Sequence, residues 1–375
     1  MSVTADEPIS AGQVTTLLLL SRISLTVVYF GTPLVIKQDV WWQSFFSALM
    51  GIGFAWVHVY LWQSYPNQSL LAAAETLLGR AAGRLVALAY ALFYLLFVSL
   101  NLRLTGEFFL YAFFPRTPLV VVVGVVAVLA AWAARAGVEV MGRAAQVVLP
   151  LAVGTVLLVT LLLAHDIKWH RLLPLELLRT GPLPHLQDMI GVAARTVELA
   201  WAGLLPLAEG RRGWGLFRAV VRAQIWLGAI WVVMNVAIIG MLGREIQVHQ
   251  FPFYVAATQV SVADFLERID ALILAIWVFG MVIRSGMVLW AAAVCTARTL
   301  GLAAYRPLVL ALAALAVTYA VAQARSFGEL MSYLKTETLT SLTIIFTLII
   351  PGLLAAGAAL RGALGADQAR SGAGG

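Results

Sequence analysis

Charged residues and cysteine are scarce in this sequence. Of its 375 residues only 11% are charged, against about 25% in a typical soluble domain. The single cysteine, Cys295, excludes a disulfide framework and a Cys-based metal site. The five histidines lack metal-ligand spacing, and a Walker-type phosphate loop, a nucleophile elbow and an HExxH motif are all missing. We therefore expect no catalytic residues, no metal site and no cofactor.

Hydrophobic residues, by contrast, make up 62% of the chain, and the mean hydropathy is +0.92. They form long unbroken runs, which predicts an all-α polytopic membrane protein and not a β-barrel. Arginines in cytoplasmic loops account for the net charge of +7, so we expect a lipid bilayer and no nucleic acid as partner. Many of the twelve tryptophans, including Trp41 and Trp42, lie near the ends of the runs, which is typical of an aromatic belt.

A membrane-spanning helix needs roughly 20 mostly apolar residues, and ten segments meet this requirement. They are 13–35, 41–62, 85–113, 118–136, 145–164, 187–208, 218–242, 266–297, 307–323 and 338–360. Ten spans put both termini on one side, where the loops carry twelve Lys and Arg residues against nine on the other side. This bias predicts cytoplasmic termini.

Residues 1–360 are expected to form one transmembrane domain, and the Gly- and Ala-rich residues 361–375 a disordered cytoplasmic tail. Between the second and third spans, Ser69–Arg84 is apolar at helical spacing and is expected to lie along the membrane surface.

Glu198 is the most deeply placed acid, because it lies near the middle of the sixth span. A charge at this depth costs about 2.5–3.5 kcal/mol on insertion scales and therefore faces a cavity or a partner. Arg195 is one turn away on nearly the same face, and a structural ion pair between helices is one interpretation. A ligand or proton site is the other, and it is favoured by Gly203 and Pro206, which weaken the helix and free backbone groups.

The first span is also polar and interrupted. It carries Ser21, Arg22, Ser24 and Thr26 near its middle and Gly31-Thr32-Pro33 near its end. The first and sixth spans are five apart, and interrupted segments at matching positions of two halves point to a transporter-type binding site. Ten spans thus suggest a five-plus-five inverted repeat. Half-helix ends at such breaks hold the carboxylate and ammonium groups of a small zwitterion.

Other polar residues in the spans have less specific interpretations. Arg103 and Glu107 form an i,i+4 pair on the third span, with Ser99 on the same face, and a structural ion pair is favoured. Glu267 and Arg268 belong to a charged, structural cap at the start of the eighth span.

Two further residues, Arg284 and Trp201, each have two possible roles beside Glu198. Arg284 lies about four turns inside the eighth span, where either Glu198 or a ligand carboxylate is its expected partner. Trp201 lies one turn after Glu198 and forms either the wall of a ligand pocket or, more commonly, part of the core.

Several short stretches in order resemble the B subunit of bacterial spore-germination receptors, which are ten-span members of the amino acid–polyamine–organocation transporter superfamily with a LeuT-like fold. The resemblance covers about residues 9–360. The stretches that carry it are Lys37–Trp41 (KQDVW), Leu78–Gly83 (LGRAAG), Leu102–Phe108 (LRLTGEF), Pro115–Pro118 (PRTP), Leu172–Pro174 (LLP) and Asp264–Asp270 (DFLERID), which leads to Trp277.

The resemblance implies a subunit that senses a small nutrient germinant, commonly an amino acid, beside an A subunit and a lipoprotein C subunit. It also implies a spore inner membrane or cell membrane location. The ligand would lie between spans one, three, six, eight and ten. On this chain that directs attention to Ser24, Leu25, Thr26, Phe93, Phe97, Ser99, Glu198, Trp201, Ile283 and Arg284.

Three functions remain open on the sequence. The first is a germinant receptor subunit, in which binding biases two arrangements of the bundle. The second is an amino acid or amine transporter in which Glu198 carries a proton. The third is a structural membrane subunit that only holds its partners or an ion path.

Overall fold

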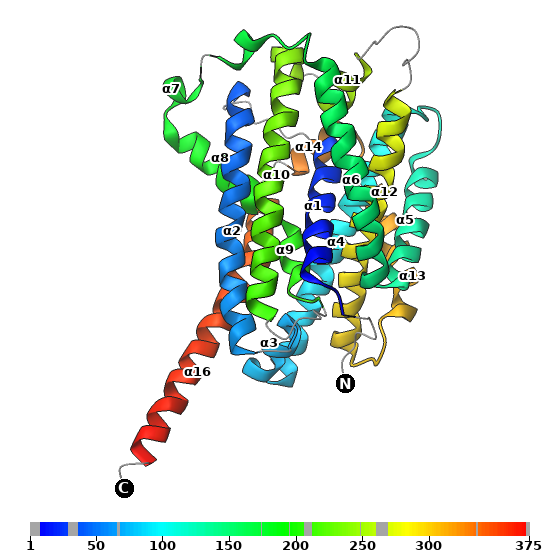
Figure 1. The fold of residues 1–375 in the computed structure, drawn as a ribbon. Helices are drawn as coiled ribbons and strands as arrows, with labels where there is room; N and C mark the ends of the chain where they lie inside the picture. Colours follow the sequence, from blue (N-terminus) through cyan, green and yellow to red (C-terminus); the bar gives the residue numbers. More distant parts are fainter. Residues whose placement is uncertain are drawn as a thin grey trace.

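The computed structural model describes residues 8–28, 37–65, 68–173, 175–194, 196–205, 212–247, 249–259, 269–334 and 337–372. They fold into a bundle of helices (Figure 1). The long helices are α1 (Ala11–Val28), α2 (Val40–Ser64), α4 (Arg80–Ala112), α5 (Leu119–Ala136), α6 (Val138–Leu163), α10 (Arg212–Leu242), α12 (Ile269–Leu300), α13 (Val309–Ala322) and α16 (Ile350–Gly372). The shorter helices are α3 (Leu70–Leu78), α7 (Leu177–Thr180), α8 (Pro182–Ala194), α9 (Val197–Ala202), α11 (Pro252–Thr258), α14 (Phe327–Leu334) and α15 (Glu337–Ile344).

Five single turns complete the chain. Four are 3₁₀ turns: η1 (Lys37–Asp39), η2 (Trp169–Leu172), η3 (Gly243–Gln247) and η4 (Arg306–Leu308). The fifth, η5 (Ile345–Ile349), is a π-helical turn that joins α15 to α16.

Seven of the described helices are long and apolar enough to cross a membrane. They are α2, α4, α5, α6, α10, α12 and the segment from α15 to α16. An eighth span results if α13 and α14 are counted together across their bend of 108°. The other two predicted spans correspond to α1 and to the pair α8 and α9. The all-α polytopic fold is therefore confirmed.

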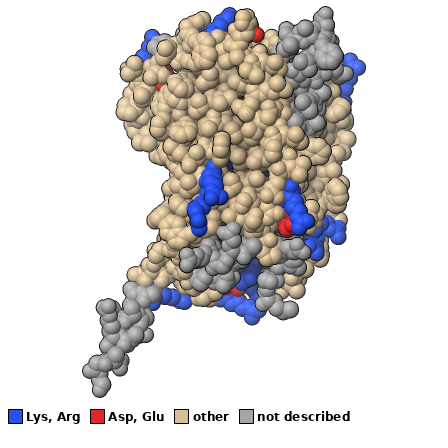
Figure 2. Space-filling model, viewed as in Figure 1, with Lys and Arg blue, Asp and Glu red and all other residues tan. Residues whose placement is uncertain are grey.

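The outer surface is apolar, as hydrocarbon requires. Along α5, Val121, Val125, Val128 and Trp132 are exposed on one face. In the space-filling view of Figure 2, Lys and Arg lie at the upper end and over the lower half of the visible face, and the zone between them is mostly uncharged. The interior instead holds buried polar side chains, Glu198 and Arg284 among them. Such an arrangement is stable in a bilayer, where the exterior needs no water.

The sixth span is broken near Gly203, as predicted, and it has a second break that the sequence did not predict. Helix α8 ends at Ala194, and Thr196 has the non-helical angles φ −85° and ψ 72° before α9 begins at Val197. This second break precedes Glu198, whereas the predicted break follows it, near Gly203. Helix α9 then ends at Ala202, and Pro206 lies outside the described residues.

The first span shows no break among its described residues. Helix α1 is continuous to Val28, so the stretch from Ser21 to Thr26 is helical. The predicted interruption at Gly31 and Pro33 falls outside the described residues.

Helix α3 lies at the end of the bundle where α1 begins and toward which α16 runs (Figure 1). Ser69 caps it, because the hydroxyl accepts from the Ala72 N–H at 3.3 Å. The Leu70 N–H donates to the Gly203 carbonyl, just after α9, at 3.0 Å. This short helix occupies the first part of the stretch that the sequence predicts to lie along the membrane surface.

Two arginines join α3 to two of the spans, α12 and α16. Arg298, on α12, donates to both carboxylate oxygens of Glu75 at 2.8 and 2.7 Å. Arg361, on α16, donates to the Thr76 and Leu77 carbonyls at 3.0 and 2.6 Å. Since these are the last carbonyls of α3, Arg361 satisfies groups that have no partner inside the helix.

Candidate functional site

The centre of the bundle holds an ion pair between Glu198 on α9 and Arg284 on α12. Both residues are almost completely buried, at 0% and 2% exposure. One guanidinium nitrogen of Arg284, Nη1, donates to Glu198 Oε1. The same nitrogen donates to the Ser21 carbonyl at 3.0 Å, and Nε donates to Asn101 Oδ1 at 3.2 Å. Four helices, α1, α4, α9 and α12, therefore meet at one guanidinium.

A second arginine approaches Glu198 from α1. Arg22 Nη1 lies 3.9 Å from Glu198 Oε2, which is the limit of an ion pair. The Arg22 guanidinium also lies over the Trp231 ring, 5.1 Å from its centroid, in a cation–π contact. Trp231 in turn donates its indole N–H to Thr26 Oγ1 at 2.8 Å. Helix α10 is thus a wall of the site that the sequence interpretation did not include.

A small cavity lies beside the carboxylate. Its polar lining consists of Arg22, Thr196, Glu198 and Gln224, and apolar residues of α1, α9 and α10 complete the wall. The cavity has a volume of about 10 Å³, which is room for about one water. Among the residues that the structure describes, none donates a hydrogen bond to Glu198 Oε2. The site is thus closed, with one carboxylate oxygen still free to accept.

The predicted residues of α1 lie near this site but are engaged with other partners. The Ser24 carbonyl accepts from the Trp277 indole at 2.7 Å. Thr26 donates its hydroxyl to the Arg22 carbonyl at 2.8 Å, and Leu25 is half-buried against the core. These contacts hold α1 against α10 and α12.

The predicted residues of α4 meet the π-helical turn η5. The Phe93 ring is stacked on Phe346 with centroids 4.3 Å apart, and Phe97 packs on Phe93 at 4.8 Å. The Tyr90 hydroxyl donates to the Phe346 carbonyl at 2.7 Å. Because a π turn disturbs the regular backbone bonding, this hydroxyl stabilises span ten at its irregular point. Ser99 donates to the Leu96 carbonyl of its own helix at 2.6 Å.

Trp201 and Ile283 are both buried in the hydrophobic core. For Trp201, this agrees with the interpretation as a core residue. Glu267 and Arg268 lie outside the described residues.

The Arg103–Glu107 pair has an additional role. The two residues form an ion pair of 2.8 Å on α4. Arg103 Nη1 also donates to the Ala320 and Val321 carbonyls, at 3.1 and 3.2 Å. These are the last carbonyls of α13, just before the chain bends into α14, so Arg103 stabilises that bend.

A second buried carboxylate, Asp39, lies at the other end of the bundle from α3. Its Oδ1 accepts from the Glu176 N–H at 2.9 Å, and its Oδ2 accepts from the Leu177 N–H at 2.7 Å. His185 Nε2 is hydrogen-bonded to Oδ2 at 3.0 Å. Asp39 thus ties η1 to α7 and α8, and it lies inside one of the stretches that carry the family resemblance.

The sequence interpretation missed Asn101 and Gln224 as site residues. Both are polar side chains inside apolar spans, which was the available signal. In the described residues, no group of three or more His, Cys, Asp or Glu side chains is arranged to hold a metal ion.

Comparison with known proteins places this chain in a family. A family model described as spore germination protein matches residues 8–321. The Bacillus subtilis protein YfkT, whose name assigns it to spore germination, is 29% identical over 248 residues, which are 64% of this chain and 66% of that protein. Spore germination protein KB of Bacillus subtilis is 24% identical over 266 residues, 69% of this chain and 70% of that protein. The matched region thus spans about two thirds of each relative.

The fold also matches a solved structure. A Na⁺-coupled sialic acid symporter in a substrate-bound, outward-open state superimposes with a TM-score of 0.57 at 11% identity, over 90% of this chain and 79% of the symporter. At this identity the match shows a LeuT-like fold and nothing about substrate. From the family match and this fold, the chain belongs to the spore germination protein family and is a multi-pass membrane protein.

Proposed function

We propose that this chain is the B subunit of a germinant receptor and binds a small nutrient, such as an amino acid, at Glu198. The observation that carries the proposal is the buried Glu198–Arg284 pair directly after the break in a LeuT-like bundle. A buried ion pair costs desolvation energy and contributes little net stability. Its presence is therefore better explained by recognition of a charged ligand than by the fold alone.

The charges suit a zwitterion. Glu198 Oε2 is positioned to accept from an ammonium group, and Arg22 and Arg284 are positioned to bind a carboxylate. The side chains proposed to line an opened pocket are Ser24, Leu25, Thr26, Phe93, Phe97, Ser99, Trp201 and Ile283. Because the present cavity holds about one water, the ligand must stabilise a second, open arrangement.

The A and C subunits are proposed to read that change, in a spore inner membrane or cell membrane with both chain ends in the cytoplasm. Thr76 and Arg179 are exposed at opposite ends of the bundle. The only natural cysteine, Cys295, is buried. Cysteines introduced at each position therefore test the orientation with a membrane-impermeant thiol reagent. Arg179→Cys should react in intact cells and Thr76→Cys only after permeabilisation.

Binding is tested with purified protein in proteoliposomes and a panel of the twenty amino acids. We expect at least one to raise the melting temperature of the wild type and none to raise that of Glu198→Gln. Because Glu198→Gln leaves Arg284 without a counter-charge, Glu198→Gln/Arg284→Met serves as a second, better-balanced variant. Glu139→Gln, the same change in an ion pair near the start of α6, is the matched control and should keep the response.

The same vesicles distinguish a receptor from a transporter. Uptake of labelled amino acid that depends on a proton gradient and is lost in Glu198→Gln would support the transporter. A melting shift without uptake supports the receptor. Neither response in the wild type would contradict ligand binding and leave a structural subunit.

A further inference from the structure

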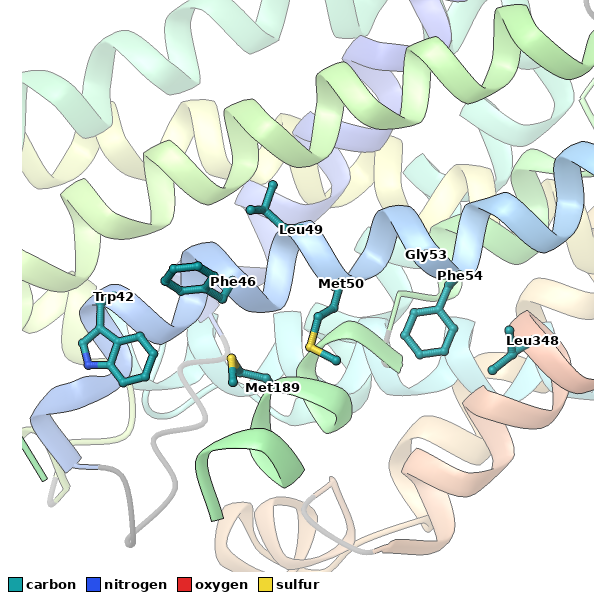
Figure 3. Close-up of a pocket in the computed structure, with 8 residues that line it drawn as sticks. All are labelled: Trp42, Phe46, Leu49, Met50, Gly53, Phe54, Met189 and Leu348. Carbon is teal, nitrogen blue, oxygen red and sulfur yellow. The ribbon is translucent and has the colours of Figure 1, made fainter. Parts of the chain in front are cut away.

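A long apolar groove runs along α2 on the outside of the bundle. Figure 3 shows its lining, which comes from α2 on one side and from Met189 on α8 and Leu348 on η5 on the other. It is a shallow groove, open to the outside of the bundle, with a volume of about 810 Å³. All eight lining residues are uncharged: Trp42, Phe46, Leu49, Met50, Gly53, Phe54, Met189 and Leu348.

The groove follows from three local features. The α2 residues recur every three or four positions, so they form one stripe on the helix. Helix α8 leaves the bundle at the break before Thr196, and Figure 1 shows it standing outside α2. Gly53 removes a side chain from the stripe, and a Cβ added there would meet no atom within 4 Å.

The length of the groove along α2 is close to the thickness of one leaflet of a bilayer. Trp42 and Phe54 are twelve residues apart, which is about 18 Å along a helix, and half of the hydrocarbon core is about 15 Å. Trp42 lies at one end of the groove, near the start of α2, where an interfacial tryptophan belongs. In Figure 3 its indole nitrogen is on the ring edge away from the other lining residues. This N–H is itself buried and has no acceptor among the described residues, so the tryptophan meets the groove with its apolar ring.

The lining favours a flexible chain over a second helix. Helices that pair in a membrane approach through small residues such as Gly, Ala and Ser, and Gly53 is the single small residue in the lining. Met50 and Met189 carry flexible, polarisable side chains that adapt to irregular ligands. A partner helix would also continue across both leaflets. We infer that the groove binds one acyl chain of a membrane lipid, from the leaflet at the Trp42 end.

The inference is tested by photo-labelling in phosphatidylcholine vesicles. The probe is a phosphatidylcholine with a diazirine on one acyl chain, and labelled peptides are mapped by mass spectrometry. We expect residues 42–54 and Met189 to carry several-fold more label than the exposed face of α5. Gly53→Leu, which places a side chain in the groove, should reduce this label at least fivefold.

The matched control is Gly154→Leu on α6, where an added Cβ also meets no atom within 4 Å. It should leave the labelling unchanged, and the melting temperature of both variants is measured beside it. If Gly53→Leu does not fold, Gly53→Ala replaces it, with a smaller reduction expected. Equal labelling of the groove and α5, or unchanged labelling in a folded Gly53 variant, would overturn the proposal. Label that falls as the protein-to-lipid ratio rises would also overturn it, because a second copy of the chain would then fill the groove.

Discussion

Two buried carboxylates, Asp39 and Glu198, show the difference between a structural and a functional acid. Both are completely buried. Both oxygens of Asp39 accept hydrogen bonds, two from backbone N–H groups and one shared with His185. Among the described residues, hydrogen bonds reach Glu198 at Oε1 alone, and Oε2 faces a cavity and a second arginine at 3.9 Å.

The difference teaches that burial alone does not identify a site. A satisfied acid contributes to the fold, whereas an acid with spare acceptor capacity next to a cavity is available to a ligand. Substitutions of Asp39 should therefore affect mainly the stability of the protein. Substitutions of Glu198 should affect both its stability and its response to a ligand.

The largest effect is expected from breaking the pair at Glu198. Arg284→Met leaves a buried carboxylate without its main counter-charge and should destabilise the protein by about 3–5 kcal/mol. Adding Glu198→Gln should recover much of this loss, because no uncompensated acid then remains. Denaturant unfolding in detergent measures the coupling of the double-mutant cycle. Additive effects of the two changes would contradict direct interaction.

Asp39→Asn should cost about 1–3 kcal/mol, because one acceptor is replaced by a donor that faces backbone N–H groups. The free energy of unfolding is compared with that of the wild type in the same detergent. Any amino acid response of the wild type should survive, because Asp39 does not line the cavity beside Glu198. Loss of the response in a folded Asp39→Asn protein would contradict the assignment of Asp39 as a purely structural acid.

Two neighbouring tyrosines on α4 offer the same comparison between neutral groups. The Tyr90 hydroxyl donates to the Phe346 carbonyl, whereas the Tyr94 hydroxyl is buried without a partner among the described residues. Tyr90→Phe should cost about 0.5–1.5 kcal/mol. Tyr94→Phe, the matched control, should be neutral or slightly stabilising. Equal losses in melting temperature would show that these two hydroxyls are not distinguished by their hydrogen bonds.

The smallest effect concerns Glu75, a partly exposed carboxylate outside the spans. The hydrogen bonds from Arg298 lower the pKa of Glu75 below its ordinary value of 4.5. A lowered pKa in the folded state means that the pair stabilises the protein above pH 4.5, and that this contribution is lost as the pH falls through the folded pKa. Glu75→Gln should therefore lower stability by ~1 kcal/mol or less at neutral pH.

The measurement is the melting temperature of both proteins between neutral and acid pH. The difference between wild type and Glu75→Gln should shrink below pH 4.5. A difference that grows as the pH falls would contradict the sign of this pKa shift.

The spans were predictable because long apolar runs are rarely stable outside a bilayer. Helix ends were less predictable. Helix α6 begins at Val138, well before the predicted 145, and α10 at Arg212 instead of 218. Charged residues such as Arg143 and Arg218 mark where the hydrocarbon ends, but a helix continues into water at no cost to its backbone bonds.

In the ion pair of the site, Glu198 was one of two partners predicted for Arg284, because buried charges are costly and need partners. The geometry of the pair was not predictable. The Ser21 carbonyl carries no sequence signal, and Asn101 and Gln224 enter only because their helices are rotated toward the centre. The break before Thr196 was not predicted, since Gly203 and Pro206 are stronger helix breakers than Arg195 and Thr196. The groove depends on the direction of α8, which periodicity does not encode.

The attachment of α3 has a mechanical consequence. This nine-residue helix is bonded to the chain after α9, to α12 through Arg298 and to α16 through Arg361. A displacement of α9 that admits a molecule beside Glu198 must either drag α3 along or break the Leu70–Gly203 bond. Through these bonds a movement of α9 beside Glu198 would be passed to the ends of α12 and α16.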